Sequence, residues 1–156
     1  MRTYRQQLTI TSDSNEQFLN LSFEVEECVR RSFISEGICV VYSQHTTSAI
    51  FLENDREDLF EDWTEMLRKI VPDESNYKVD YTSAGAAHMK QMLLGASVTI
   101  PVTEGRLELG PRQFIMYGDF DGCREKTVLV KIIGECPGRE FQQMLSVIIP
   151  SNNADE

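Results

Sequence analysis

Six consecutive residues, Gln44 to Ala49, form a polar interruption between two apolar segments of the chain. They contain no glycine or proline, so a surface turn explains them poorly. The imidazole of His45 can serve as a base, a metal ligand or a hydrogen-bond donor, and the hydroxyls of Thr46 and Thr47 add donors and acceptors beside it. The alternative is a structural histidine at the end of a strand. The clustered hydroxyls favour a functional site.

The chain has one other histidine, His88. We expect it to meet His45 in one polar pocket, where the two could act as a catalytic pair or as metal ligands. Two histidines and one carboxylate would make a metal site, with Glu53 as the expected third ligand. Lys90 follows two residues after His88 and is a candidate ligand-binding cation, although a solvated helix lysine is equally consistent. The other candidate carboxylates are Asp55, Asp119 and Asp121, of which the last two are expected to shape a hairpin turn.

Arginines supply the best candidates for holding an anion. A planar guanidinium can bind a phosphate through two hydrogen bonds. Arg106 lies in a segment bounded by Gly105 and Gly110, which lacks the ending of a phosphate-binding loop and reads mainly as a hairpin and strand. Arg124 follows the last predicted turn. Both arginines are therefore candidate ligand-binding residues, together with Arg112.

The composition limits the classes of function. A chain of 156 residues suits one domain with a single core. A net charge of -10 argues against a nucleic-acid partner, since such proteins usually carry a basic face. No apolar run is long enough to span a bilayer, and the first ten residues do not resemble a signal peptide, so we expect a cytoplasmic protein without a membrane partner. The four cysteines form no Cys-x-x-Cys pair, which makes a zinc knuckle unexpected.

The hydrophobic pattern predicts three helices. The first begins with Ser22 as its N-cap, runs to about Ser35 and places Phe33 on its inner face. The second follows Asp55 as its cap and ends before Pro72. The third covers 83–94 and ends at Gly95.

Strands are predicted before and after these helices. The segment 38–43 is continuously apolar and predicts a strand buried on both faces. Four later strands, joined by short turns, predict an antiparallel meander that closes the sheet. The fold class is therefore α+β: a mixed, mainly antiparallel sheet with about three helices packed on it, ending in a β-meander. The predicted strands are 3–10, 18–21, 38–43, 50–52, 97–103, 106–109, 112–117 and 126–133.

The C-terminal residues are predicted to lie outside the folded domain. Residues 1–134 form the predicted domain. Residues 135–150 form a tail that is apolar enough to dock onto it, and residues 151–156 are expected to be disordered.

A set of spaced motifs resembles the YjbQ family, also called the secondary thiamine-phosphate synthase family. The similarity runs in order from about Leu8 to Gly134. No single motif is decisive, but the ordered set is specific. The matching positions are His45-Thr46-Thr47-x-Ala49-Ile50, Ala87-His88-x-Lys90, Leu94-Gly95-x-Ser97, Ile100-Pro101-Val102, Gly105-Arg106-Leu107-x-Leu109-Gly110, Gln113 and Asp121-Gly122.

The resemblance implies a compact α+β subunit that assembles as a homotrimer, with a pocket around His45 and His88. It also implies a weak thiamine-phosphate synthase activity, which joins a pyrimidine diphosphate to a thiazole phosphate and releases pyrophosphate. Such a reaction needs a divalent metal, Mg or Zn, or a cationic pocket to stabilise the departing group.

The chain departs from the family pattern at several positions. It has Glu53-Asn54 where the family usually has Asn-Glu, and such a shift turns a strand residue to the opposite face. The further histidine that follows a tyrosine equivalent to about Tyr77 is replaced by Lys78. Arg112 stands where the family has tryptophan.

Three functions remain open from the sequence. The first is an enzyme acting on small phosphorylated substrates through His45 and His88. The second is a non-catalytic homotrimer that binds a metal or a phosphate ligand. The third is a structural or partner-binding domain.

Overall fold

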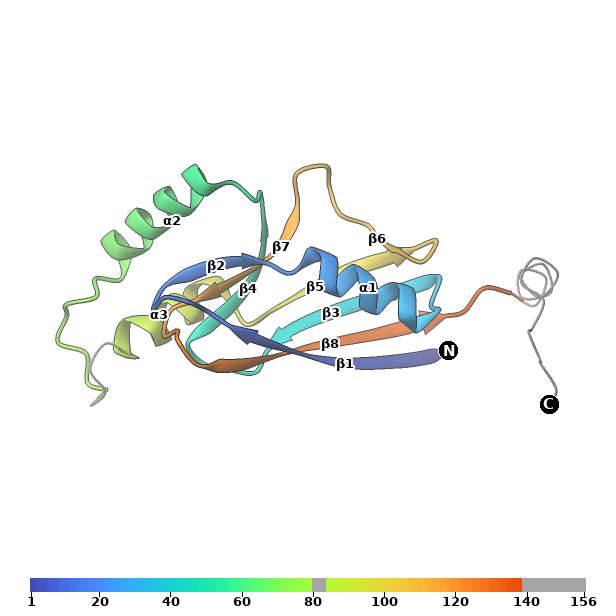
Figure 1. Cartoon of the computed structure of the whole chain (residues 1–156), viewed down its shortest axis with the longest axis horizontal. Helices are drawn as coiled ribbons and strands as arrows, with labels where there is room; N and C mark the ends of the chain where they lie inside the picture. The colour runs from blue at the N-terminus through green and yellow to red at the C-terminus, as the bar shows by residue number, and fades with distance from the viewer. Residues whose placement is uncertain (80–83, 139–156) are drawn as a thin grey trace, which may run out of the picture.

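The structure is a computed structural model that describes residues 1–79 and 84–138. It contains three helices and two antiparallel sheets, shown in Figure 1. No helix within these residues is long and apolar enough to cross a membrane. The elements are β1 (Arg2–Thr11), β2 (Gln17–Asn20), α1 (Ser22–Ser32), β3 (Glu36–Ser43), β4 (Ser48–Glu53), α2 (Glu57–Ile70), α3 (Ala84–Leu94), β5 (Ser97–Thr103), β6 (Arg106–Leu107), β7 (Phe114–Asp119) and β8 (Glu125–Glu135).

The larger sheet, sheet A, has five strands in the order β1-β8-β3-β5-β6. Its strands alternate between buried and accessible residues, as expected when only one face is covered. The covered face carries Cys39, Val41, Val128 and Val130, which are fully buried. Helix α1 packs Val25, Cys28 and Val29 into the same cluster. The main core therefore lies between α1, the inner face of sheet A and part of the second sheet.

The second sheet, sheet B, has three strands in the order β2-β7-β4 and is buried on both faces. Ile50, Ile115 and Tyr117 join the main core from one face. The other face packs against α2 and α3 in a second cluster rich in aromatic residues. Its members include Phe18, Ala49, Leu67, Ala87, Met116 and Phe120.

The α+β class, the three helices and the antiparallel strands are confirmed. The last strands, however, do not form one continuous meander. Strands β5 and β6 form a hairpin in sheet A, β7 pairs with β2 and β4 in sheet B, and β8 returns to sheet A between β1 and β3. Every pairing among the described strands is antiparallel.

Several local predictions were wrong. Helix α1 ends at Ser32, and Phe33 takes a left-handed conformation that leaves it 67% exposed. Strand β3 is buried on one face only, since Ile38 and Tyr42 are exposed. The capping predictions also failed, because Leu21 and Arg56 occupy the two N-cap positions and neither makes a side-chain capping bond.

The other element predictions agree with the structure within a few residues. The third helix ends at Gly95, whose positive φ and bond from its N–H to the carbonyl of Gln91 form a helix C-cap. The predicted docking segment after Gly138 lies outside the described residues.

Candidate functional site

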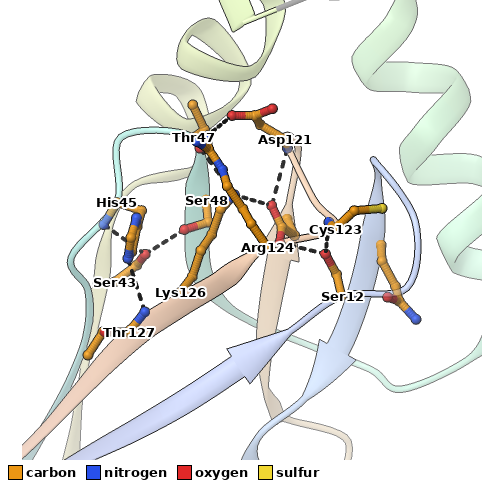
Figure 2. Close-up of polar contacts among 12 residues, drawn as sticks. Ser12, Ser43, His45, Thr47, Ser48, Asp121, Cys123, Arg124, Lys126 and Thr127 are labelled. Atoms are coloured by element: carbon orange, nitrogen blue, oxygen red, sulfur yellow. Dashed lines mark hydrogen bonds and ion pairs between the residues drawn. The ribbon is translucent and has the colours of Figure 1, made fainter.

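The polar stretch that contains His45 lies where the two sheets come together. It connects β3 of sheet A to β4 of sheet B. Ser43 is in register with Val128 of β8, and Ser48 is in register with Asp119 of β7. The register therefore brings the β3–β4 loop beside the turn that joins β7 to β8, as Figure 2 shows.

A buried ion pair forms the floor of this region. The Nζ of Lys126 lies 2.5 Å from Oδ1 of Asp119, and both side chains are at most 1% exposed. Lys126 also donates to the hydroxyl of Thr47 at 3.2 Å, and Ser12 donates to the other oxygen of Asp119 at 2.8 Å. We call Ser12, Thr47, Asp119 and Lys126 the Lys126 cluster.

The Lys126 cluster ties four parts of the chain together: the end of β1, the β3–β4 loop, the end of β7 and the start of β8. Burying two charges is costly, and good geometry with further hydrogen bonds is what offsets that cost. Sequence reasoning missed Lys126. Its period-2 alternation with Val128, Val130 and Ile132 places it on the buried face of β8, which was the available signal.

His45 is half-buried and bonded through one ring nitrogen. The backbone N–H of Thr127 donates to Nε2 of His45 at 3.0 Å. An imidazole that accepts a hydrogen bond at one nitrogen is neutral, and it carries its proton on the other, Nδ1. Burial lowers the pKa of His45 below its usual range, and the nearby cations Lys126 and Arg124 lower it further. His45 therefore offers a donor at Nδ1 and no free acceptor.

Arg124 stands at the rim of the same region. Its side chain is 61% exposed and forms an ion pair with Asp121. The pair uses one guanidinium nitrogen, so further donors remain for a ligand. Thr46, which follows His45 in the sequence, is exposed, whereas Thr47 is buried in the Lys126 cluster. The predicted residues His45, Thr46, Thr47 and Arg124 are thus gathered at one end of the molecule.

Lys90 lines a cavity of about 470 Å³ that adjoins this region through Phe120 and Asp121. The lysine is 3% exposed, donates to Asp73 at 2.8 Å and to Glu16 at 3.2 Å, and lies over the ring of Phe120. Arg68 bridges the second oxygens of the same two acids. Lys90 is therefore a buried member of a four-charge ring, and not a solvated lysine.

His88 is half-buried on α3. Its neighbour Ala87 packs in the same apolar cluster as Ala49, so the two predicted segments do approach one another. Among the hydrogen bonds of residues 1–79 and 84–138, none joins His88 to His45. Each segment contributes a small apolar side chain to that cluster.

Two predicted residues lie far from His45. Glu53 ends β4, five residues beyond Ser48, which is roughly 17 Å along a strand. Arg106 pairs with Thr103, six residues along β5 from Ser97, which pairs with Tyr42 near the site. The separation corresponds to about 20 Å. Figure 1 places β6 at the opposite end of the molecule from α3.

Two of the expected metal ligands, His45 and Glu53, are not placed to share a metal ion within the described residues. The Nε2 lone pair of His45 is already used by Thr127, and Glu53 is distant. The described part of the chain holds no group of three His, Cys, Asp or Glu side chains that could coordinate a metal.

Comparison with known proteins agrees with this fold. The family described as UPF0047 protein YjbQ-like matches residues 6–135. A UPF0047 protein of Archaeoglobus fulgidus is 37% identical over 81% of this chain and 99% of its own length. The UPF0047 protein YugU of Bacillus subtilis is 32% identical over 81% of this chain and 97% of its own.

Solved structures give the same result. A YbjQ-like protein of unknown function from Sulfolobus solfataricus superposes with a TM-score of 0.82 at 28% identity, covering 86% of this chain and 99% of that one. An uncharacterised family protein from Clostridium acetobutylicum superposes with a TM-score of 0.78 at 34% identity, covering 82% and 99% of the two chains. The chain therefore belongs to the YjbQ (UPF0047) family.

Proposed function

We propose that this protein binds a small phosphorylated molecule at the rim of the Lys126 cluster, with Arg124 and His45 contacting the phosphate. The observation that carries the proposal is the bond from the Thr127 N–H to Nε2 of His45, at 3.0 Å. It fixes the neutral imidazole with its proton on Nδ1, so the ring meets a ligand as a donor. Phosphate oxygens are acceptors and suit such a donor.

The surrounding charges support an anionic ligand. Lys126 and Arg124 both lie close enough to His45 to disfavour its protonated form. Because Asp119 neutralises Lys126, the exposed guanidinium of Arg124 is the cation available for direct contact. The remainder of the ligand would extend past Asp121 into the cavity that Lys90 lines.

This arrangement is compatible with the weak thiamine-phosphate synthase-type reaction that the family resemblance implies. In that reaction, negative charge develops on the departing pyrophosphate. Fixed donors and cations stabilise such charge without a base. His45 would act as a donor to the leaving group, and Arg124 as the clamp that orients it.

The alternative is a binding protein without catalysis. This alternative is favoured because the polar groups of the Lys126 cluster bond to one another: Asp119 already accepts from Ser12 and Lys126. Neither this acid nor Nε2 of His45 is free to remove a proton from a substrate.

Growth complementation separates the two functions. We expect the wild-type chain to restore growth of a thiamine-requiring strain that lacks thiamine-phosphate synthase, and His45→Ala to reduce that growth. Equal growth with a variant carrying both His45→Ala and His88→Ala would exclude catalysis by these histidines. In parallel, calorimetric titration with thiamine phosphate tests binding directly. Binding without complementation would assign the non-catalytic function.

We also propose that the chain assembles as a homotrimer through the outer face of sheet A. This face exposes Ile38 and Tyr42, at 43% and 42%, while Val40 and Leu129 beside them are only half-buried. Apolar residues gathered on one sheet face are typical of an interaction surface.

A further inference from the structure

A second cavity lies between α2 and sheet B, away from the histidines. Its volume is about 170 Å³, and its lining is mainly apolar. Helix α2 contributes Trp63, Met66 and Leu67, while β2 and β4 contribute Phe18 and Phe51. In Figure 1, α2 lies at the outer side of the molecule, beyond the strands of sheet B.

Three aromatic rings line this cavity and pack edge to face against one another. The ring of Trp63 lies 5.2 Å from that of Phe18 and 5.5 Å from that of Phe51, measured between centroids, with interplanar angles of 85° and 81°. Phe18 and Phe51 are also nearly perpendicular. Aromatic faces attract both other rings and cations.

One acidic side chain, the exposed Glu53, also lines the cavity at its rim. Its Oε1 accepts the backbone N–H of Asn54 at 2.9 Å. Glu53 forms no ion pair with any residue in 1–79 or 84–138. A carboxylate without a cationic partner therefore stands beside an aromatic cavity.

We infer that this cavity binds a small cation built on one aromatic ring. The ring would lie against Trp63, Phe18 and Phe51, and its ammonium or amidinium group would pair with Glu53. The size agrees, since an apolar cavity of about 150 Å³ is known to accept benzene. Charge complementarity selects a cation over an anion.

The inference does not rest on the phosphate site. Glu53 ends β4, whereas Ser48 at the other end of the same strand lies beside Asp119. The two ligands would therefore occupy opposite ends of one strand. Failure at either site would leave the other untouched.

Trp63 is the only tryptophan in the chain, so its fluorescence reports directly on the cavity. The experiment titrates the full chain with benzylammonium chloride and, as a neutral match, with benzyl alcohol. We expect a saturable change in Trp63 emission with benzylammonium, and an affinity at least about fivefold weaker for benzyl alcohol. In Glu53→Gln, the two probes should bind equally.

A cavity-filling variant provides the second test. Leu94→Phe adds a ring to the lining and should abolish the response to both probes, while far-UV circular dichroism confirms that the variant is folded. If benzylammonium leaves the fluorescence of Trp63 in the wild type unchanged, the inference is overturned. The same result is expected if a second copy of the chain covers the cavity, and it would overturn the inference equally. Equal binding of benzylammonium by wild type and Glu53→Gln would also overturn it.

Discussion

At the level of single residues, one hydrogen bond defines what His45 can do. Its Nε2 accepts from the backbone of Thr127, and burial together with two nearby cations lowers its pKa. The His45 ring is therefore held neutral by its hydrogen bond to Thr127, near the start of β8. Sequence reasoning identified the residue but left base, ligand and donor open, because the partner of each nitrogen depends on strand register.

His45 should make stability depend on pH. Since its folded-state pKa lies below the unfolded value of about 6.5, the unfolded chain takes up the proton first as pH falls. The contribution of His45 is present above pH 6.5 and is lost as pH falls through the lowered folded pKa. Urea unfolding of wild type at pH 7.5 and 5.0 should show this loss.

Replacing His45 by alanine should cost about 1 kcal/mol at pH 7.5, because the N–H of Thr127 loses its acceptor. The same variant should lose less stability than wild type between pH 7.5 and 5.0. His88→Ala serves as the control for removing a histidine elsewhere. An unchanged pH response in His45→Ala would assign the pH dependence to other groups.

The Lys126–Asp119 pair should be intolerant of single replacement. Lys126→Met leaves a buried carboxylate without its partner and should cost roughly 3–5 kcal/mol. Adding Asp119→Leu removes that uncompensated charge, so the double variant should be more stable than Lys126→Met alone. Urea denaturation measures both. If the loss in the double variant equals the sum of the losses in Lys126→Met and in Asp119→Leu alone, the two residues are not coupled.

At the level of elements, helix α1 carries a conformational cost at its C-terminus. Phe33 occupies the left-handed region with a φ of 56° and is 67% exposed. A residue with a Cβ is disfavoured in this conformation, whereas glycine adopts it readily. Because Phe33 is apolar and falls at helical spacing, the sequence pattern wrongly predicted that it lies on the buried face of the helix.

Phe33→Gly should therefore stabilise the protein by about 1 kcal/mol, despite losing the stacking of Arg2 over the ring. Phe23→Gly is the matched control, since Phe23 is also exposed but lies in the first turn of α1 without a positive φ, so glycine there should destabilise the protein. Thermal unfolding of both variants gives the comparison. A lower melting temperature for Phe33→Gly would contradict the assignment.

Hydrophobic periodicity predicted the individual helices and most strands. In α2 the apolar residues recur at helical spacing, and in β1 the partly buried residues alternate with exposed ones, so both patterns can be seen within a short stretch of sequence. Periodicity did not predict how strands divide between two sheets. Strand β7 alternates between residues of the two cores, Ile115 and Tyr117 on one side and Met116 on the other. A short strand buried on both faces looks the same in either sheet, so only long-range pairing decides.

The same limit applies to the candidate site. Reasoning from residue types and spacing identified His45, Thr47 and Arg124, which the fold gathers together. It also proposed Glu53 and Arg106, which the fold places at other strand ends. Lys126 was missed because it lies in an ordinary strand pattern, and Ser12 because it lies in a turn-like segment just after β1. The role of both depends on contacts across β1, β7 and β8.

At the level of the whole molecule, the proposed homotrimer should have three times the 17.9 kDa mass of one chain. Light scattering coupled to size-exclusion chromatography measures this mass. Ile38→Lys places a charge on the outer face of sheet A and should shift the mass toward that of a single chain. A trimer that persists in Ile38→Lys would assign the interface to another surface.

The whole chain carries a net charge of -10, so anion binding must depend on local cations. We propose that this cation is Arg124, beside neutral His45, and not Arg106 at the opposite end of sheet A. The two arginines are both exposed and provide a matched pair of variants.

Calorimetric titration with pyrophosphate is the most direct measurement of this claim. Wild type should bind, Arg124→Gln should weaken binding at least about tenfold, and Arg106→Gln should match wild type. Absence of pyrophosphate binding in wild type, or an equal loss of affinity in both variants, would contradict the account.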